Sequence, residues 1–89
     1  MWASQLRGAR AVLQMGQSEL AERSGVSLAS IKRFEAMEGR IEARTGTVQR
    51  LMSALEEAGV QFIAENGGGP GVRLRQTLSP PSAGERGEA

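Results

Sequence analysis

Apolar residues recur at helical spacing through the first 58 residues of the chain. In residues 4–15, Leu6, Ala9 and Leu13 fall on one face of a helix that Ser4 would cap. Three further segments show similar periodicity and are bounded by glycines or capping residues: 17–24, 28–37 and 45–58. The pattern therefore predicts four helices in this part of the chain.

A glycine and a serine separate the two middle segments. Gly25 directly follows the first, where a helix end favours a residue that tolerates positive φ. Ser27 precedes the second and is the expected N-cap. In residues 28–37, Ile31 and Phe34 point to one side. The other side carries small or basic residues: Ala29, Lys32, Arg33 and Ala36. We expect that side to stay free for a partner.

The periodicity changes after Gly59. Residues 60–64 form a short, apolar, β-favouring run, and residues 72–75 alternate apolar and basic positions, so strands are expected at about 60–65 and 71–76. The glycine-rich stretch 66–71 is a strong turn signal. We predict a β-hairpin, which must pack on the helices or on another chain because an isolated hairpin is marginal in water.

These patterns divide the chain into three parts. The expected fold is mainly α, with four to five helices in residues 1–58 and a C-terminal hairpin in residues 59–78. The hairpin is expected to serve dimerisation or packing. Residues 79–89 are rich in Pro, Ser, Gly and charge, and they are predicted to form a disordered tail.

Composition narrows the functional classes. The 89 residues include no Cys, His, Tyr or Asp. Disulfide bonds, Cys or His metal sites and nucleophilic catalysis with a His base are therefore excluded. Only a site built from Glu is left open, and no Glu pair flanks a cleft-like apolar segment. We expect a binding protein rather than an enzyme, with no cofactor and no metal.

The net charge of +1 conceals an uneven distribution. Residues 1–55 carry eight Lys or Arg against five Glu, whereas residues 56–89 carry three against five. All but one of the cations are Arg, whose guanidinium suits phosphates and guanine edges. A basic front half favours a nucleic-acid partner, although a solvated surface or a GC-rich genome gives similar counts.

Length and hydropathy indicate the cellular location and the oligomeric state to expect. No stretch reaches the about 18 apolar residues of a membrane helix. The start of the chain lacks a basic region followed by an apolar run, so we expect no secretory signal and a cytoplasmic location. A chain of this size buries only about 60–65% of its unfolded surface, which favours dimerisation.

Residues 17–36, QSELAERSGVSLASIKRFEA, have the most informative spacing. Ala21 lies four residues before Gly25, and Ile31 lies six residues after it. Two steeply crossing helices need a small residue at their contact, which Ala21 supplies, and a tight turn, which Gly25 allows. An apolar side chain such as Ile31 then fills the angle between them. Here the chain resembles the helix-turn-helix family of phage-repressor-like regulators, the XRE or Cro/C1 type. The matching residues are Gln17, Leu20, Ala21, Gly25, Val26, Ser27, Ile31 and Glu35.

The resemblance covers about residues 6–55. Residues 59–75 are also similar to a C-terminal extension of many small bacterial members. The family implies a DNA interface in which Gln17 contacts a phosphate through its side chain and helix N-terminus. Ser27 either caps the following helix alone or also touches a phosphate.

The free side of residues 28–36 would then lie in a major groove. Arg33 is the expected reader of a guanine edge, and Lys32 is expected to reach a phosphate. Ala29 would touch a thymine methyl or allow close approach, and Ser30 lies at the flank. A solvated helix face is the alternative for all of them. Leu28 departs from the family, which often has a polar residue there, so it either reads a thymine methyl or packs.

Two arginines follow the predicted recognition helix. The family often lays this loop on the DNA backbone, so Arg40 and Arg44 are expected to contact phosphates. Glu38 and Glu42 would repel phosphates unless they pair with these arginines.

Two further sets of residues have expected structural roles. The family commonly pairs an Arg of its first helix with a Glu of its third, which here are Arg10 and Glu35. Dimer contacts are expected from the end of the fourth helix and from the apolar residues of the hairpin: Val60, Phe62, Ile63, Val72 and Leu74.

The resulting hypothesis is a sequence-specific, double-stranded DNA-binding regulator of bacterial or phage type. A homodimer would bind an inverted-repeat operator with half-sites about one turn, ~34 Å, apart. Repression by blocking RNA polymerase is the simplest output, and activation by contacting polymerase stays open. The alternative is an antitoxin that uses residues 76–89, or an adaptor protein, although Leu78 is the only apolar anchor in that segment.

Overall fold

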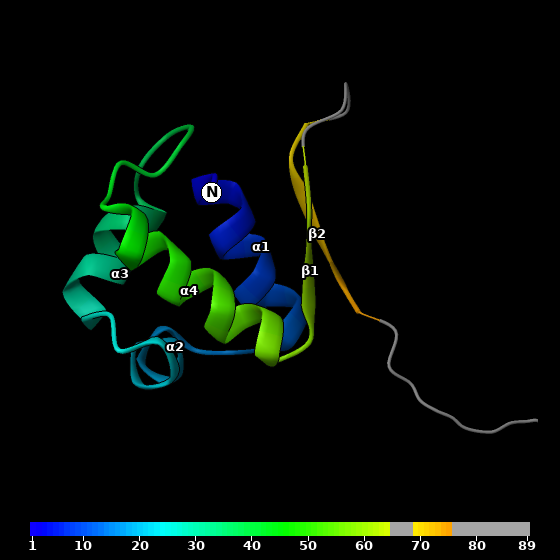
Figure 1. Cartoon of the computed structure of the whole chain (residues 1–89), viewed down its shortest axis with the longest axis horizontal. Coiled ribbons are helices and arrows are strands. Elements are labelled where there is room, and N and C mark those ends of the chain that lie inside the picture. The colour runs from blue at the N-terminus through cyan, green and yellow to red at the C-terminus, as the bar shows by residue number, and fades with distance from the viewer. Residues whose placement is uncertain (65–68, 76–89) are drawn as a thin grey trace, which may run out of the picture.

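Four helices are followed by two strands in the computed structural model, which describes residues 1–64 and 69–75 (Figure 1). The elements are α1 (Ala3–Leu13), α2 (Gln17–Ser24), α3 (Leu28–Glu35), α4 (Thr45–Glu57), β1 (Val60–Ile63) and β2 (Gly71–Leu74). The prediction of a mainly helical chain with an antiparallel hairpin is confirmed. None of the helices in the described ranges is long and apolar enough to cross a membrane.

The helices surround one hydrophobic core. α2 packs on α3 and α4, while α1 packs on α3 and on the hairpin. Every helix and β1 contribute to the core. Its largest fully buried side chains are Leu6, Leu20, Ile31, Phe34, Leu51, Leu55 and Val60. The predicted inward positions Leu6, Ile31 and Phe34 are confirmed.

The α2–α3 connection follows the local signals in the sequence. Gly25 adopts a left-handed φ of 77°, and its N–H donates to the Ala21 carbonyl at 2.9 Å. The Ser27 hydroxyl accepts a hydrogen bond from the Ser30 N–H at 3.1 Å, which makes Ser27 the N-cap of α3. The side chain of Ser24 adds a contact that the sequence did not indicate, because its hydroxyl accepts from the N–H of Val26.

The ends of α1 differ from the prediction. The helix begins at Ala3, so the proposed capping role of Ser4 is wrong. The tertiary structure supplies the missing partners, since the Ala3 N–H donates to the Gly39 carbonyl and the Trp2 N–H donates to Gln5 Oε1. The helix ends at Leu13, because Gln14 takes a left-handed φ of 55°. α3 ends at Glu35 and α4 at Glu57, two residues and one residue earlier than predicted.

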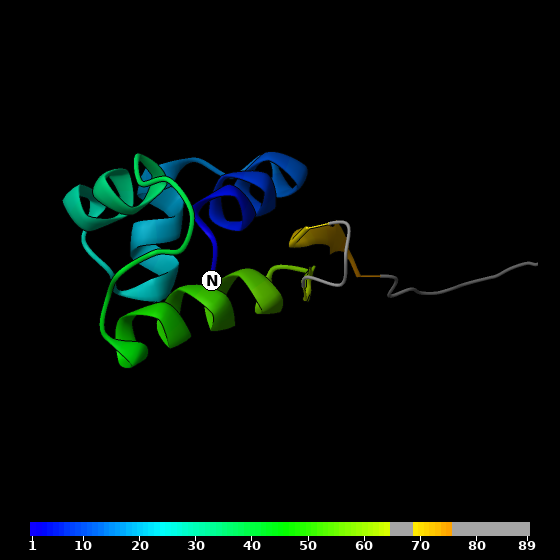
Figure 2. The same ribbon diagram turned by 90° about the horizontal axis from the view of Figure 1, so that it is seen from above.

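The hairpin pairs its strands with Val60 opposite Leu74 and Phe62 opposite Val72. Figure 2 shows β2 beside α1 and β1 beside the end of α4. The approach of α1 is close, since a Cβ on Gly8 would lie 3.3 Å from Val72 Cγ2. Both strands are shorter than predicted. The predicted turn before residue 69, the end of the hairpin at 76–78 and the predicted disordered tail lie outside the described residues.

A buried glutamine joins α1 to both strands. The Gln5 side-chain amide donates to the Ile63 carbonyl at 3.2 Å and to the Gly71 carbonyl at 3.1 Å, and its oxygen accepts from Trp2. Gln5 is only 7% exposed, so these three bonds are formed away from bulk water. A buried polar group without such partners would cost free energy. Gln5 therefore fixes the hairpin on the helices at a specific register.

We predict that Gln5→Ala lowers the free energy of unfolding by about 1–3 kcal/mol, because it removes three bonds to buried or half-buried groups. Gln61→Ala is the matched control. Its side chain accepts a hydrogen bond from Arg73 on the exposed face of the hairpin, so we expect a loss within about 0.5 kcal/mol. Denaturant unfolding of both variants measures the difference, and equal losses would contradict a role for Gln5 in joining the hairpin.

Candidate nucleic-acid interface

α3 lies at the edge of the molecule (Figure 1). Ala29, Lys32 and Arg33 are exposed on this helix, whereas Leu28 and Ser30 are half-buried. The structure thus brings together the residues that the sequence assigned to a groove-facing surface. We call Leu28, Ala29, Ser30, Lys32 and Arg33 the α3 face.

The guanidinium of Arg33 lies over the aromatic ring of the next residue, Phe34. The guanidinium carbon lies 5.0 Å from the centre of the Phe34 ring, within the range of a cation–π contact. Neither Arg33 nor Lys32 forms an ion pair with any carboxylate in the described part of the chain. Both cations are therefore available to an anionic partner without breaking a salt bridge.

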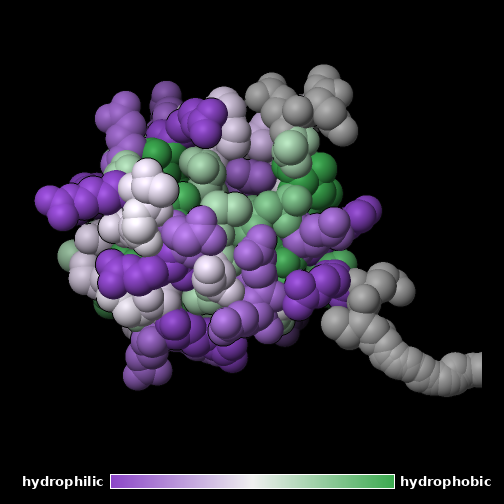
Figure 3. Space-filling model, viewed as in Figure 1, coloured by the Kyte–Doolittle hydropathy of each residue, from purple (hydrophilic) through white to green (hydrophobic). Residues whose placement is uncertain are grey.

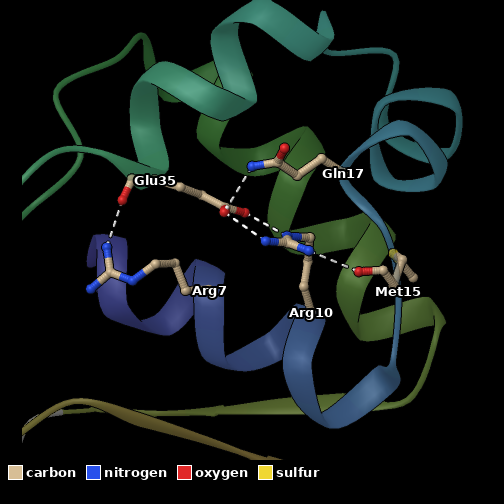
Figure 4. Close-up of polar contacts among 5 residues, drawn as sticks. All are labelled: Arg7, Arg10, Met15, Gln17 and Glu35. Carbon is tan, nitrogen blue, oxygen red and sulfur yellow. Dashed lines mark hydrogen bonds and ion pairs between the residues drawn. The ribbon is translucent and has the colours of Figure 1, made fainter.

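A polar network fixes the end of α3 to α1 and α2 (Figure 4). Arg10 binds the Glu35 carboxylate with two nitrogens, Nε to Oε2 at 2.6 Å and Nη2 to Oε1 at 2.7 Å. Its remaining Nη1 donates to the Met15 carbonyl at 2.9 Å. The predicted partners Arg10 and Glu35 are thus in bidentate contact. The side chain of Glu35 is only 7% exposed, whereas that of Arg10 is 22% exposed.

Two more side chains complete this network. Gln17 donates from Nε2 to Glu35 Oε1 at 3.0 Å, and Arg7 donates from Nη1 to the Glu35 backbone carbonyl at 2.6 Å. Arg7 thereby places a cation at the C-terminal end of α3, where the helix dipole is negative. The sequence reasoning missed Arg7. The only available signal was its position three residues before Arg10, which puts both on neighbouring positions of one helix.

The contact with Glu35 orients the side chain of Gln17. An amide nitrogen has two N–H groups, and one of them is used by Glu35. Gln17 also opens α2, whose N-terminus favours negative charge. The second N–H and the N-terminus of α2 are the groups that a phosphate contact at Gln17 would require.

Opposing effects determine the charge of Glu35. Burial raises the pKa of the carboxyl, whereas the hydrogen bonds from Arg10 and Gln17 lower it, as do the positive charges of Arg10 and Arg7. The lowering effects prevail, so the pKa of Glu35 lies below the ordinary value. The hydrogen bond to Glu35 raises the pKa of Arg10 against a smaller effect of burial. Both groups therefore stay charged at neutral pH.

The two arginines that the sequence predicts to contact DNA phosphates lie in the segment between α3 and α4. Arg40 and Arg44 are exposed, and neither pairs with Glu38 or Glu42 within the described ranges. Arg44 occupies the position before α4 without capping it by its side chain. Arg40 forms a backbone bridge with Trp2, and its guanidinium carbon lies 5.8 Å from the centre of the Trp2 ring.

The predicted dimer contacts on the hairpin have unequal exposure. Val60 is completely buried in the core of the single chain, so its assignment to a dimer surface is wrong. Phe62 and Val72 are partly buried against the same core, and Ile63 is half-buried. Leu74 is 56% exposed. Figure 3 shows apolar residues gathered beside the hairpin, while hydrophilic residues predominate on the side of α3.

Comparisons with known proteins add no assignment. No protein-family model matches the chain, and no curated protein matches it. Within residues 1–64 and 69–75 there is also no group of three acidic, His or Cys residues that could hold a metal ion.

We predict that Glu35→Ala lowers the free energy of unfolding by about 3 kcal/mol at neutral pH, because it leaves Arg10 partly buried without its partner. Glu57→Ala is the control, since Glu57 is exposed and forms no ion pair with the described residues. Thermal or denaturant unfolding gives both values. A loss no larger than that of Glu57→Ala would contradict the role of the network.

The difference in unfolding free energy between wild type and Glu35→Ala should also depend on pH. A carboxyl whose folded-state pKa is lowered stabilises the fold above its unfolded pKa, and this stabilisation is lost as the pH falls through the folded value. The difference between wild type and Glu35→Ala should therefore be constant near neutrality and shrink as the pH falls below the ordinary value of 4.5. A difference that stays constant into acid would contradict an ionised Glu35.

Proposed function

We propose that this protein is a sequence-specific, double-stranded DNA-binding regulator of the phage-repressor-like helix-turn-helix type. The observation that carries the proposal is the α3 face, which holds two unpaired cations within the described residues, together with Gln17, which is bound to Glu35 at the end of the same helix. In this proposal α3 enters a major groove and α2 lies across the backbone, as in the known docking geometry of such motifs.

The chemistry of the side chains indicates which residues contact bases and which contact phosphates in this proposal. Arg33 carries a forked guanidinium that suits the O6 and N7 atoms of guanine, and it leaves the ring of Phe34 to reach them. Gln17, Lys32, Arg40 and Arg44 contact phosphates, which position the protein without reading sequence. The small side chain of Ala29 lets the backbone of α3 approach the bases.

The network at Glu35 supports this division. Because one carboxylate binds both Arg10 and Gln17, the start of α2 is held at a fixed place relative to the end of α3. A phosphate contact at Gln17 and a base contact at Arg33 then have a defined spacing on the DNA. Such pre-organisation reduces the entropy lost on binding.

A homodimer on an inverted-repeat operator completes the proposal. The exposed Leu74 offers apolar surface on the hairpin, which lies away from α3 (Figure 1), and the half-buried Ile63 lies on the opposite face of the same hairpin. Two copies joined through Leu74 would each present an α3 face. Their two-fold symmetry would match an inverted repeat, with half-sites about one helical turn apart as in other dimers that use such motifs. Repression by excluding RNA polymerase from the bound site is the simplest output.

We predict that Arg33→Ala and Arg44→Ala weaken DNA binding in different ways. Arg33→Ala should relax sequence preference at one position per half-site and cost about 1–3 kcal/mol on the selected sequence. Arg44→Ala should weaken binding to all sequences alike and reduce the salt dependence by about one unit of slope. Selection of bound sequences from a random pool, followed by gel shifts at two salt concentrations, measures both effects.

Glu57→Gln is the control for those measurements, because Glu57 is exposed near the C-terminal end of α4 and lies outside the proposed contacts. It should keep the wild-type preference and the wild-type salt dependence. Two results would reject the proposed function: no enriched sequence from the pool, or an Arg33→Ala protein whose preference is unchanged.

We predict that Leu74→Glu converts the dimer to a monomer, because it places a charge in the proposed apolar contact. Analytical ultracentrifugation measures the mass, and Gln49→Glu, an equal charge change on α4, should stay dimeric. A point variant is preferable to a deletion, since removal of the hairpin also removes Val60 from the core. A dimer that survives Leu74→Glu would contradict this surface.

A further inference from the structure

A cavity of about 290 Å³ lies between the start of the chain, α4 and the end of the hairpin nearest its turn. Its walls are mainly apolar, with Trp2, Met52, Ala64 and Pro70 among them, and of the described residues Arg40 and Gln5 line it with polar side chains. Small-molecule sites have this character, an apolar hollow with a few polar groups, and this volume is near their lower limit of about 300 Å³. The hollow therefore suits a small ligand.

The second polar lining residue is already fully engaged. The amide of Gln5 donates to the carbonyls of Ile63 and Gly71 and accepts from the N–H of Trp2. Among the described side chains that line the cavity, Gln5 is thus committed to the fold, and Arg40 is left to recognise a polar ligand group.

Arg40 and Trp2 are arranged to act together. Their backbones are paired in a β-bridge, and the guanidinium of Arg40 lies over the indole ring. No carboxylate in the described parts of the chain forms an ion pair with Arg40. A guanidinium binds a carboxylate through two parallel hydrogen bonds, and the indole and the Met52 thioether offer apolar, polarisable contacts to the rest of a ligand.

We propose that this cavity binds a small apolar monocarboxylic acid. Arg40 holds the carboxylate, while Trp2 and Met52 hold the aromatic or short aliphatic body. The charge of the ligand and the apolar walls are both required, so neither a neutral analogue nor a carboxylate without an apolar body is expected to bind well.

Occupancy of the cavity would also regulate DNA binding, a consequence that rests on the proposed function. Arg40 is one of the proposed phosphate contacts, and a bound carboxylate neutralises its charge. Since phosphate contacts carry no sequence information, the acid should weaken binding to all DNA sequences alike. The protein would thus release its operator as the acid accumulates.

The intrinsic fluorescence of the protein tests the site directly, because Trp2 is the only tryptophan in the chain. The full-length protein is titrated with phenylacetate and octanoate, and in parallel with phenylacetamide, octanamide and acetate. We expect a saturable change with at least one of the two acids and at least a tenfold weaker effect with its amide and with acetate. No saturable change up to about 10 mM, or equal binding of the amide, would overturn the proposal.

Variants separate the ligand site from a general effect of charge. Arg40→Gln should weaken binding of the acid at least tenfold by calorimetry, which avoids any direct effect of Arg40 on the indole emission. Arg44→Gln is the matched control and should bind the acid as wild type does, and circular dichroism confirms that both variants are folded. Equal losses in the two variants would overturn the assignment to Arg40.

The DNA measurement is independent of the titration. With a selected DNA fragment, the binding acid should weaken the complex of the wild type but not that of Arg40→Gln, with acetate at equal ionic strength as the control. If the acid binds and the DNA affinity is unchanged, the regulatory consequence is refuted and the site stands. If the protein binds no DNA at all, the proposed function fails, and the fluorescence titration still decides the site.

Discussion

The arrangement of the helices depends on how one buried carboxylate is neutralised. Glu35 is almost out of contact with water, and an uncompensated charge there would be very costly. Its partners come from α1 and from the start of α2, so the charge is satisfied only when three helices are correctly placed. Arg10 adds a bond to the carbonyl of Met15, in the connection between α1 and α2. The network therefore fixes the geometry on which the proposed DNA contacts depend, in addition to any stability that it contributes.

A second constraint comes from the hairpin, which is too small to be stable alone. Val60 completes the helical core, and Gln5 binds a backbone carbonyl on each strand. The inner face of the hairpin is therefore covered by its own chain at Val60, whereas Leu74, opposite Val60 on that face, stays 56% exposed and is the main apolar side chain left for the proposed dimer surface. The hairpin thus packs on the helices through Val60, Phe62 and Val72, and the proposed dimer would use Leu74 at the end of the same face.

Two cations of the proposed interface rest on aromatic rings rather than on carboxylates. Arg33 lies over Phe34 and Arg40 lies over Trp2, whereas the two ion pairs found in the described residues use other arginines. A cation–π contact at an exposed site is worth only about 0.5–1 kcal/mol, so these side chains can move to a phosphate, a base edge or a ligand carboxylate at small cost. This separation of structural from available arginines also explains how a chain of net charge +1 can offer a basic surface.

The sequence by itself determined the features that depend on neighbouring residues. The bounds of α2, the left-handed turn at Gly25 and the cap at Ser27 follow from propensities and from hydrogen bonds that span a few residues. The pairing of Arg10 with Glu35 came from a family resemblance, not from periodicity. Only the tertiary structure decided the rest: the start of α1, the burial of Val60 and the bonds of Gln5, whose partners lie 58 and 66 residues away. Such contacts depend on which faces of distant elements meet, and local periodicity shows that a face is apolar without showing what covers it.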